Sequence, residues 1–198
     1  MATNNTIGGV ILAGGQSRRM GHTDKGLLLF NNRPLVSYSI SAITTITDRV
    51  IISANRNFEA YAAYHLPVIA DRTDDYKGPL AGILTAFNAL LECGIILVTP
   101  CDCPLLTAVH LQKLLDARKQ HDTDIAVAFD GQRIHPVFLA LKTTLRTSLE
   151  RYLLNEHHKV ELWLKQHSLV TVDFSDEPEI FYNVNTTADL ALLQQKYP

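Results

Sequence analysis

Short apolar runs recur along the chain at intervals that suit an alternation of strands and helices. Each run is rich in Val, Ile, Leu and Ala and is bounded by polar or turn-forming residues, which is typical of buried strands. The predicted strands cover residues 8–13, 49–55, 66–71, 94–100, 123–129 and 135–141. Stretches with the 3.6-residue period of a helix lie between most of them, at residues 35–46, 57–64, 82–91, 108–120 and 144–155.

This alternation predicts an α/β protein with a Rossmann-like, mainly parallel sheet and helices on both faces. A short turn at Asp130-Gly131 joins the runs at 123–129 and 135–141, so we expect one antiparallel pairing at that edge of the sheet. A final helix is expected to begin near Thr186 or Thr187, since threonine is a common N-cap residue. No linker divides the chain, so residues 1–198 are predicted to form a single domain, with residues 1–6 as a flexible N-terminus.

Composition narrows the function. Hydrophobic residues make up 46% of the 198 residues and charged residues 19%, with a formal net charge of −2, which fits an ordinary globular protein rather than a nucleic-acid binder. There is neither an apolar run of about 18 residues nor a signal-peptide pattern, so we expect a cytoplasmic protein without a membrane segment. The three cysteines, Cys93, Cys101 and Cys103, form no zinc or disulfide pattern and are expected to be reduced and structural.

The loop after the first predicted strand carries a concentration of glycine and positive charge. Gly14 and Gly15 fall where a parallel sheet presents its loops to a ligand, and glycine lets the backbone approach an anion or a base closely. Arg18, Arg19 and Lys25 add three cations that suit phosphate groups. The stretch matches neither the P-loop pattern nor the dinucleotide fingerprint, and a tight turn beside a solvated basic face is the structural alternative.

Two acids also fall at the ends of predicted strands. Asp102 follows the apolar run 94–100, where a carboxylate suits Mg²⁺, or else caps a turn before Pro104. Asp71 ends the run 66–71, where it suits hydrogen bonds from a nucleotide, or else belongs to an exposed acidic loop.

Three further segments are ambiguous on their own residues. Asn183 and Asn185 lie two residues apart, so both amides share a face in an extended segment, or they serve as turn and capping residues. The segment KGPLAG at 77–82 has the residues of a helix start, which either points at a ligand or only begins a helix. The eight histidines show no coherent set of metal ligands.

The order of these motifs resembles one family along almost the whole chain. LAGGQSRRMG followed by DKGLL is similar to the signature loop of nucleotide-diphospho-sugar type transferases. More narrowly, the chain resembles the molybdenum cofactor guanylyltransferases. The matching segments, in chain order, are NRPL, SANR, ADRTDDYKGPLAGI, TPCDCPLL, HPVFLAL, VDFSD and FYNVNTTADL.

The resemblance implies a reaction and its participants. GMP would pass from GTP to the phosphate of molybdopterin or Mo-molybdopterin, with release of pyrophosphate. It implies Mg²⁺, for which Mn²⁺ can substitute, and transient contact with proteins that deliver molybdopterin or receive the cofactor. We expect a monomer that binds no nucleic acid and no membrane.

The resemblance also implies roles for individual residues. Lys25, Arg19 and Asp102 would be catalytic, with the two cations on the phosphates and Asp102 on the metal. The metal ligands would be Asp102 and Asn185. Nucleotide contacts would come from Leu12, Ala13, Gly14, Gly15, Lys25, Asn55, Asp71 and Asp102. Pterin contacts would come from Gly78, Pro79, Gly82, His135, Asn183 and Asn185.

Two departures from the family and three alternative functions bear on this interpretation. The chain has Thr187 where members often have proline, and Ser53 where close relatives often have asparagine, which leaves Asn55 as the expected amide contact. The alternatives are a cytidylyltransferase, a sugar-phosphate nucleotidyltransferase of the same fold, and a non-catalytic nucleotide-binding regulator. The doubled glycine of LAGG favours guanine by resemblance, and the presence of both Lys25 and Asp102 argues against a pure binder.

Overall fold

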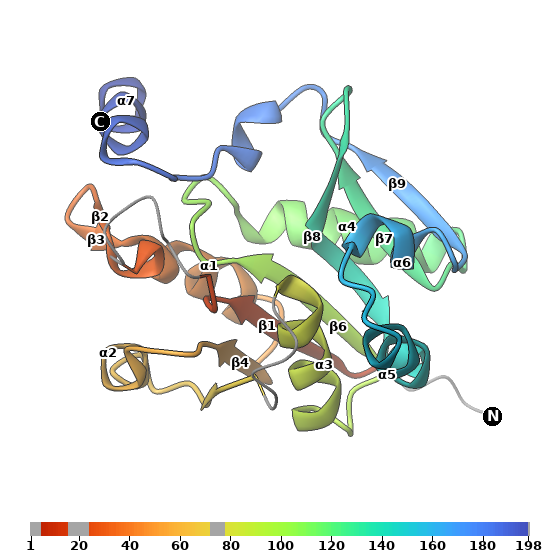
Figure 1. Cartoon of the computed structure of the whole chain (residues 1–198). Helices are drawn as coiled ribbons and strands as arrows, with labels where there is room; N and C mark the ends of the chain where they lie inside the picture. Colours follow the sequence, from red (N-terminus) through yellow and green to blue (C-terminus); the bar gives the residue numbers. More distant parts are fainter. Residues whose placement is uncertain (1–4, 16–23, 72–77, 198) are drawn as a thin grey trace.

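A twisted sheet organises the described part of the chain, which comprises residues 5–15, 24–71 and 78–197 of the computed structural model (Figure 1). Within these residues seven strands form one sheet in the order β5, β4, β1, β6, β8, β7, β9. Their bounds are β1 (Ile7–Leu12), β4 (Val50–Ser53), β5 (Val68–Ile69), β6 (Ile95–Pro100), β7 (Ile125–Phe129), β8 (Ile134–Lys142) and β9 (Leu169–Asp173). Two shorter strands, β2 (Leu29–Phe30) and β3 (Arg33–Pro34), form a separate antiparallel hairpin.

The pairing of strands confirms a mainly parallel sheet and corrects one detail. Strands β5, β4, β1 and β6 are parallel, and β7 is antiparallel to β8 as the short turn predicts. However, β8 also pairs antiparallel with β6, so it lies inside the sheet and not at its edge. The edge belongs to β9, which pairs parallel with β7 and was not predicted, because its residues are mostly half-exposed and form no continuous apolar run.

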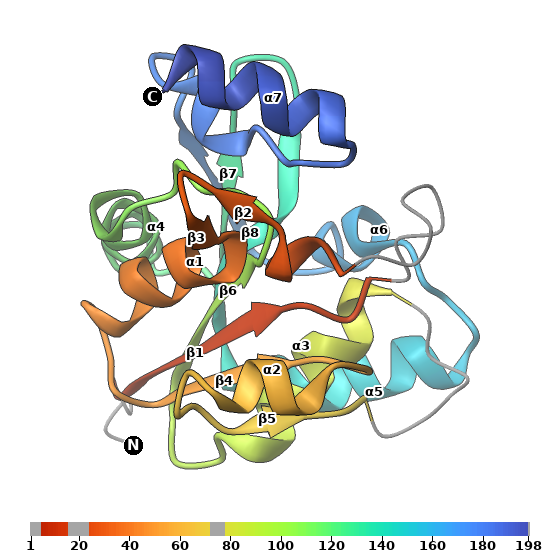
Figure 2. The same ribbon diagram turned by 90° about the vertical axis from the view of Figure 1, so that its left-hand side faces the viewer.

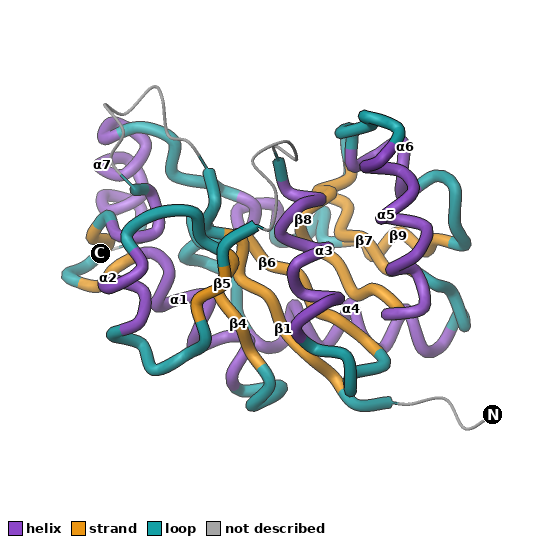
Figure 3. Tube along the Cα trace, turned by 60° about the horizontal axis from the view of Figure 1, so that its bottom comes forward, coloured by secondary structure: helices purple, strands orange, loops and turns teal. Residues whose placement is uncertain are grey.

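Helices cover both faces of the sheet, as predicted. Helices α1 (Leu35–Thr44) and α4 (Ala108–Gln120) pack on one face, where Val36, Ile43 and Leu111 join the buried cluster. Helices α3 (Pro79–Ala89), α5 (Arg146–Leu154) and α6 (Val160–Leu164) pack on the other, around Phe87 and Trp163. Figures 2 and 3 show these two helical layers with the sheet between them.

The helix bounds agree with the periodicity except at two places. Helix α3 begins at Pro79, three residues before the predicted start, because Gly78 and Pro79 supply the N-cap and the N1 position. Helix α6 was not predicted, since it is short and lies in a strongly polar segment. The remaining segments are α2 (Phe58–Ala62) and the 3-10 turns η2 (Lys25–Leu27), η3 (Thr143–Leu145) and η4 (Pro178–Phe181).

A small third core joins the C-terminal helix to the β2–β3 hairpin. Helix α7 (Thr187–Lys196) begins directly after Thr186. Thr186 is the N-cap residue, and it forms a capping box with Asp189. Buried Val184 and Leu193 pack with Phe30 and Leu35. The C-terminal segment is therefore anchored to residues that directly follow the first loop in the sequence.

The chemistry expected of the cysteines agrees with the structure. All three are free and buried.

No helix among the described residues is long and apolar enough to cross a membrane. Residues 1–4 of the predicted flexible N-terminus lie outside the described part of the chain.

Candidate functional site

The carboxyl ends of four parallel strands meet at one end of the sheet. Leu12 at the end of β1 pairs with Ser53 of β4 on one side and with Pro100 of β6 on the other. The Ala13 N–H donates to the Ser53 carbonyl at 2.8 Å, and the Cys101 N–H donates to the Leu12 carbonyl at 3.2 Å. This register brings the loops after β1, β4, β5 and β6 together, as expected for a ligand site in an open α/β sheet.

Three predicted residues, Gly14, Asn55 and Asp71, lie together with Ser53, which was not predicted as a site residue; we call this set the amide–carboxylate cluster. Asn55 Nδ2 donates to Asp71 Oδ2 at 2.9 Å, and the Asp71 N–H donates to Asn55 Oδ1 at the same distance. Ser53 Oγ donates to Asp71 Oδ1 at 3.0 Å. A Cβ at Gly14 would lie 3.1 Å from Asn55 Nδ2, so a side chain there would crowd the amide. Asp71 is thus bonded into the site rather than part of a free acidic loop.

A second group, which we call the charged cluster, consists of Lys25, Asp102 and Asn185. Lys25 Nζ lies 3.6 Å from Asp102 Oδ2 and donates a short hydrogen bond to Asn185 Oδ1. The side chains of Lys25 and Asp102 are only 24% and 13% exposed. Burial raises the pKa of the Asp102 carboxyl, and the Lys25 ammonium opposes that rise. One ion pair and one neutral amide, from three residues that are far apart in the sequence, thus meet in a partly enclosed position.

Backbone contacts fix the geometry of the charged cluster. The Val184 N–H donates to the Asp102 carbonyl at 3.1 Å, which ties the segment before α7 to the end of β6. The N–H groups of Asn185 and Thr186 donate to Asp189 Oδ2 at 3.0 and 2.8 Å. Asp189 was not among the predicted site residues, although its spacing of three from Thr186 was the signal of a capping box.

The oxygen atoms of this cluster suit a divalent cation. A carboxylate oxygen of Asp102 and the amide oxygen of Asn185 converge on one positive group, the Lys25 ammonium. Mg²⁺ is bound by such oxygen donors, usually one or two from the protein with the rest from substrate phosphates and water. The residues present therefore fit the expected metal.

A pocket of about 330 Å³ borders the charged cluster on the side of β8. The His135 ring stacks on Phe181 with 3.8 Å between centroids and 7° between planes, and His135 Nε2 lies 2.7 Å from Asp130 Oδ2. Backbone N–H donation by Arg133, aided by the hydrogen bond with His135, lowers the pKa of the Asp130 carboxyl. The lining residues are Asp130, Arg133, His135, Pro178, Phe181, Tyr182, Asn183, Asn185 and Asp189.

The residues predicted to bind the pterin therefore divide into two groups. His135, Asn183 and Asn185 line this pocket, whereas Gly78, Pro79 and Gly82 belong to the first turns of α3, which packs on β1 and β4. A Cβ at Gly82 would lie 2.6 Å from Leu12 Cδ2 and 2.8 Å from Ser53 Oγ, so glycine there allows close packing of the helix on the strands. The pterin role of all six residues stays a prediction.

Some residues bear on the site in ways that the sequence analysis did not resolve. Arg18 and Arg19 lie outside the described residues. Asp24, directly before Lys25, has a buried side chain that accepts hydrogen bonds from Gly26, from Asn57 in the loop after β4 and from Tyr61 of α2. The motif DKGLL includes Asp24, but nothing in its sequence indicates that this side chain is buried.

His110 is buried in the capping box of α4, and the sequence did not distinguish it from the exposed histidines.

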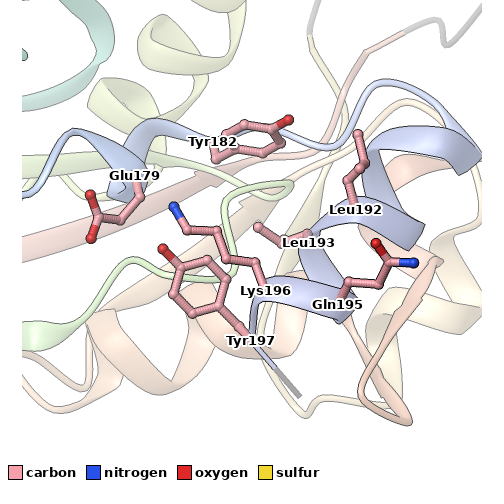
Figure 4. Close-up of a pocket in the computed structure, with 7 residues that line it drawn as sticks. All are labelled: Glu179, Tyr182, Leu192, Leu193, Gln195, Lys196 and Tyr197. Atoms are coloured by element: carbon pink, nitrogen blue, oxygen red, sulfur yellow. The ribbon is translucent and has the colours of Figure 1, made fainter.

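A second pocket, of about 410 Å³, lies between η4 and α7. Figure 4 shows the Lys196 and Tyr197 side chains close together, with Tyr182 and Leu192 on the opposite part of the rim. Its lining residues are Glu179, Tyr182, Leu192, Leu193, Gln195, Lys196 and Tyr197. None of the predicted site residues lies in it.

Comparison with known proteins identifies one family over most of the chain. Residues 9–171 match the model of the MobA-like NTP transferase domain. A protein named molybdenum cofactor guanylyltransferase from Shewanella loihica is 43% identical over 91% of each chain, and one of the same name from Shewanella baltica is 42% identical over 92% of this chain and 93% of its own.

Solved structures show the same fold at lower identity. Molybdopterin-guanine dinucleotide biosynthesis protein A from Archaeoglobus fulgidus is 20% identical, with a TM-score of 0.78 over 95% of this chain and 97% of its own. Rv0371C from Mycobacterium tuberculosis, in complex with manganese, is 19% identical, with a TM-score of 0.67 over 96% and 99% of the two chains.

Proposed function

Because this chain belongs to the family of MobA-like NTP transferases, we propose that its site transfers GMP from GTP to the phosphate of molybdopterin. The chain is a nucleotidyltransferase of molybdenum cofactor biosynthesis, the class in which its relatives at about 40% identity are named. Guanylyl transfer is favoured over the cytidylyl, sugar-phosphate and non-catalytic alternatives for the same reason. The observation within the structure that carries the proposal is the convergence of Lys25, Asp102 and Asn185 beside the ends of β1 and β6.

The reaction needs charge and position more than proton transfer. A phosphate oxygen of the pterin attacks the α-phosphorus of GTP, the bond to the β-phosphate oxygen breaks, and pyrophosphate leaves. The attacking oxygen is already anionic, so no general base is required. Preorganised positive charge stabilises such transfers, and the Lys25 ammonium supplies it from a partly enclosed position.

The two clusters divide the nucleotide between them in this proposal. Gly14 leaves room for the base beside Asn55 and Asp71, and a carboxylate accepts hydrogen bonds from the N–H groups of guanine or from ribose hydroxyls. Leu12, Ala13 and Gly15 provide the neighbouring backbone. Lys25 binds the phosphates, and Arg19 is proposed to assist it.

Asp102 and Asn185 would hold Mg²⁺, which when bound neutralises charge on the transferring phosphoryl group. Lys25 pairs ionically with Asp102 and donates a hydrogen bond to Asn185, so in the nucleotide-bound protein its ammonium is proposed to turn toward the triphosphate. The structure of the neighbour from Mycobacterium tuberculosis is of a complex with manganese, which is the metal expected to substitute.

The pocket beside β8 is proposed to take the pterin. The stacked pair of His135 and Phe181 forms a flat wall, and Asn183 and Asn185 lie beside it. Flat heteroaromatic rings pack well on such walls. We also propose that the protein is a cytoplasmic monomer. It would make brief contacts with proteins that deliver the pterin or receive the cofactor.

One assay tests base choice and transfer together. The purified chain is incubated with Mg²⁺, a molybdopterin-loaded carrier and each of the four labelled nucleoside triphosphates. We expect GTP to be used at least about tenfold better than CTP, which corresponds to about 1.4 kcal/mol of differential transition-state binding. Equal use of GTP and CTP would contradict guanylyl transfer, and absence of transfer would favour the regulator.

A further inference from the structure

A buried carboxylate lies directly before the lysine of the charged cluster. The side chain of Asp24 is 4% exposed. Its Oδ1 accepts hydrogen bonds from the Tyr61 hydroxyl at 2.6 Å and from the Gly26 N–H at 3.2 Å. Its Oδ2 accepts one from Asn57 Nδ2 at 3.0 Å and lies 3.6 Å from Arg56 Nε. Both oxygen atoms are therefore used inside the protein.

Such a carboxylate is retained in a folded protein only when its surroundings compensate for the loss of water. Here the compensation comes from three hydrogen-bond donors, Gly26, Asn57 and Tyr61, and from the positive charge of the Arg56 guanidinium group. Burial raises the pKa of Tyr61, so its hydroxyl remains a proton donor to Asp24. Asp24 is thus held as an acceptor in one fixed orientation.

The partners of Asp24 belong to separate parts of the proposed nucleotide site. Asp24 is the N-cap of η2, the turn whose first residue is Lys25. Arg56 donates from Nη2 to the Gly15 carbonyl at 2.9 Å, in the loop after β1. The neighbouring Asn55 carries the amide that bonds to Asp71. One carboxylate therefore connects the turn of Lys25 to both loops that border the amide–carboxylate cluster.

Close packing restricts this turn further. A Cβ at Gly26 would lie 2.5 Å from the Tyr61 hydroxyl oxygen and 3.2 Å from Cys101 Sγ. Cys101 immediately precedes Asp102 at the end of β6. The turn that carries Lys25 is therefore packed between Tyr61, which bonds to Asp24, and Cys101, which precedes Asp102.

We propose that Asp24 is a positioning residue that holds Lys25 at the transferring phosphates and couples it to the base-binding loops. This inference rests on the proposed function, because it acts through the role given to Lys25. Asp24 touches no substrate, since its oxygen atoms face Gly26, Tyr61, Asn57 and Arg56.

The test is a double-mutant cycle with Asp24→Asn and Lys25→Ala. The amide keeps the shape of the carboxylate but directs two hydrogens at groups that are themselves donors, so the turn should lose its fixed position. We expect kcat with GTP to fall about tenfold, since small displacements of a catalytic group cost at least that much. In the Lys25→Ala background the same substitution should change kcat by less than about twofold.

Equal losses in both backgrounds would overturn the inference, because a purely structural residue would lower kcat regardless of Lys25. Tyr61→Phe provides a milder second variant, in case Asp24→Asn does not fold, and should show the same dependence on Lys25. Asp124→Asn is the matched control. Its carboxylate accepts hydrogen bonds from Ser168, directly before β9, and from Lys142 at the end of β8, and kcat should not change.

Affinity for GTP, measured by titration calorimetry on the same proteins, separates this inference from the proposed function. If the unsubstituted chain transfers no nucleotide, the proposed function fails, and coupling of Asp24 to Lys25 in GTP affinity still supports a positioning role. Additive effects on affinity in that case would overturn it, as would a chain that does not bind GTP.

Discussion

The two clusters at the ends of the parallel strands are built in different ways. The amide–carboxylate cluster comes from neighbouring strands whose register alone places Ser53, Asn55 and Asp71 together. The charged cluster takes Asn185 from a segment 160 residues beyond Lys25, and depends on the packing of α7 against the hairpin. The first is thus a product of local sheet geometry and the second of long-range assembly.

This contrast suggests a division of labour. Hydrogen bonds in the amide–carboxylate cluster are shared among several groups, so loss of one should alter selection of the base more than the chemistry. The charged cluster holds one ammonium and one carboxylate, and the proposed reaction places each of them where charge develops. Three substitutions test this division, beginning with the largest expected effect.

Asp102→Asn should lower turnover by at least about 10², with little recovery at raised Mg²⁺, because the ligand charge is lost. The melting temperature of the nucleotide-free protein should stay within a few degrees of the unsubstituted value, since burial already disfavours the charged form of this carboxyl. Turnover, Mg²⁺-dependent GTP affinity and melting are measured on one preparation. A strongly destabilised variant would indicate a turn-capping role instead, and a stable, fully active one would remove Asp102 from the reaction.

Lys25→Ala should lower turnover by about 10², because it removes one preorganised charge at the transferring group. Steady-state kinetics with GTP measure the loss. Lys119→Ala, at the end of α4, is the matched control for loss of a lysine and should leave turnover unchanged. Near-normal turnover of the Lys25 variant would mean that the loop only presents a solvated basic face.

Asp71→Asn should mainly reduce the preference for GTP over CTP, by about tenfold, with a smaller effect on turnover. Its new amide would face the Asn55 amide and lose the acceptor at Oδ2. The ratio of kcat/KM for the two nucleotides measures the change. Asp116→Asn on α4 is the control, since that exposed carboxylate accepts a hydrogen bond from Gln112 on the same helix. A large loss of turnover with unchanged base preference would break the proposed division.

The same contrast explains what could be predicted from sequence. Strands β1, β4 and β6 and the residues at their ends follow from apolar runs and from the rule that ligands lie at the carboxyl ends of parallel strands. Asp71 and Asp102 were therefore located correctly at that end of the sheet. Their roles in binding stay predictions.

Other features depend on tertiary contacts that no local pattern contains. The interior position of β8 results from its pairing with both β6 and β7, and the edge strand β9 has one fully buried residue and no continuous apolar run. Gly82 and His135 are separated because Gly82 lies in α3, which packs on β1 and β4, whereas His135 lies in β8. Likewise, Asp24 has the sequence of an exposed loop acid, and its burial results from Tyr61 and Arg56, which come from the next part of the fold.

The hydrogen bond from Val184 to the Asp102 carbonyl has a consequence for when the site forms during synthesis of the chain. During translation, β1, Lys25 and Asp102 leave the ribosome long before the segment that carries Asn185. A nascent chain that ends at β9 would hold the sheet residues and the amide–carboxylate cluster but lack one side of the charged cluster. Because Asn185 lies directly before α7, the charged cluster is complete only after the segment that contains α7 has been synthesised.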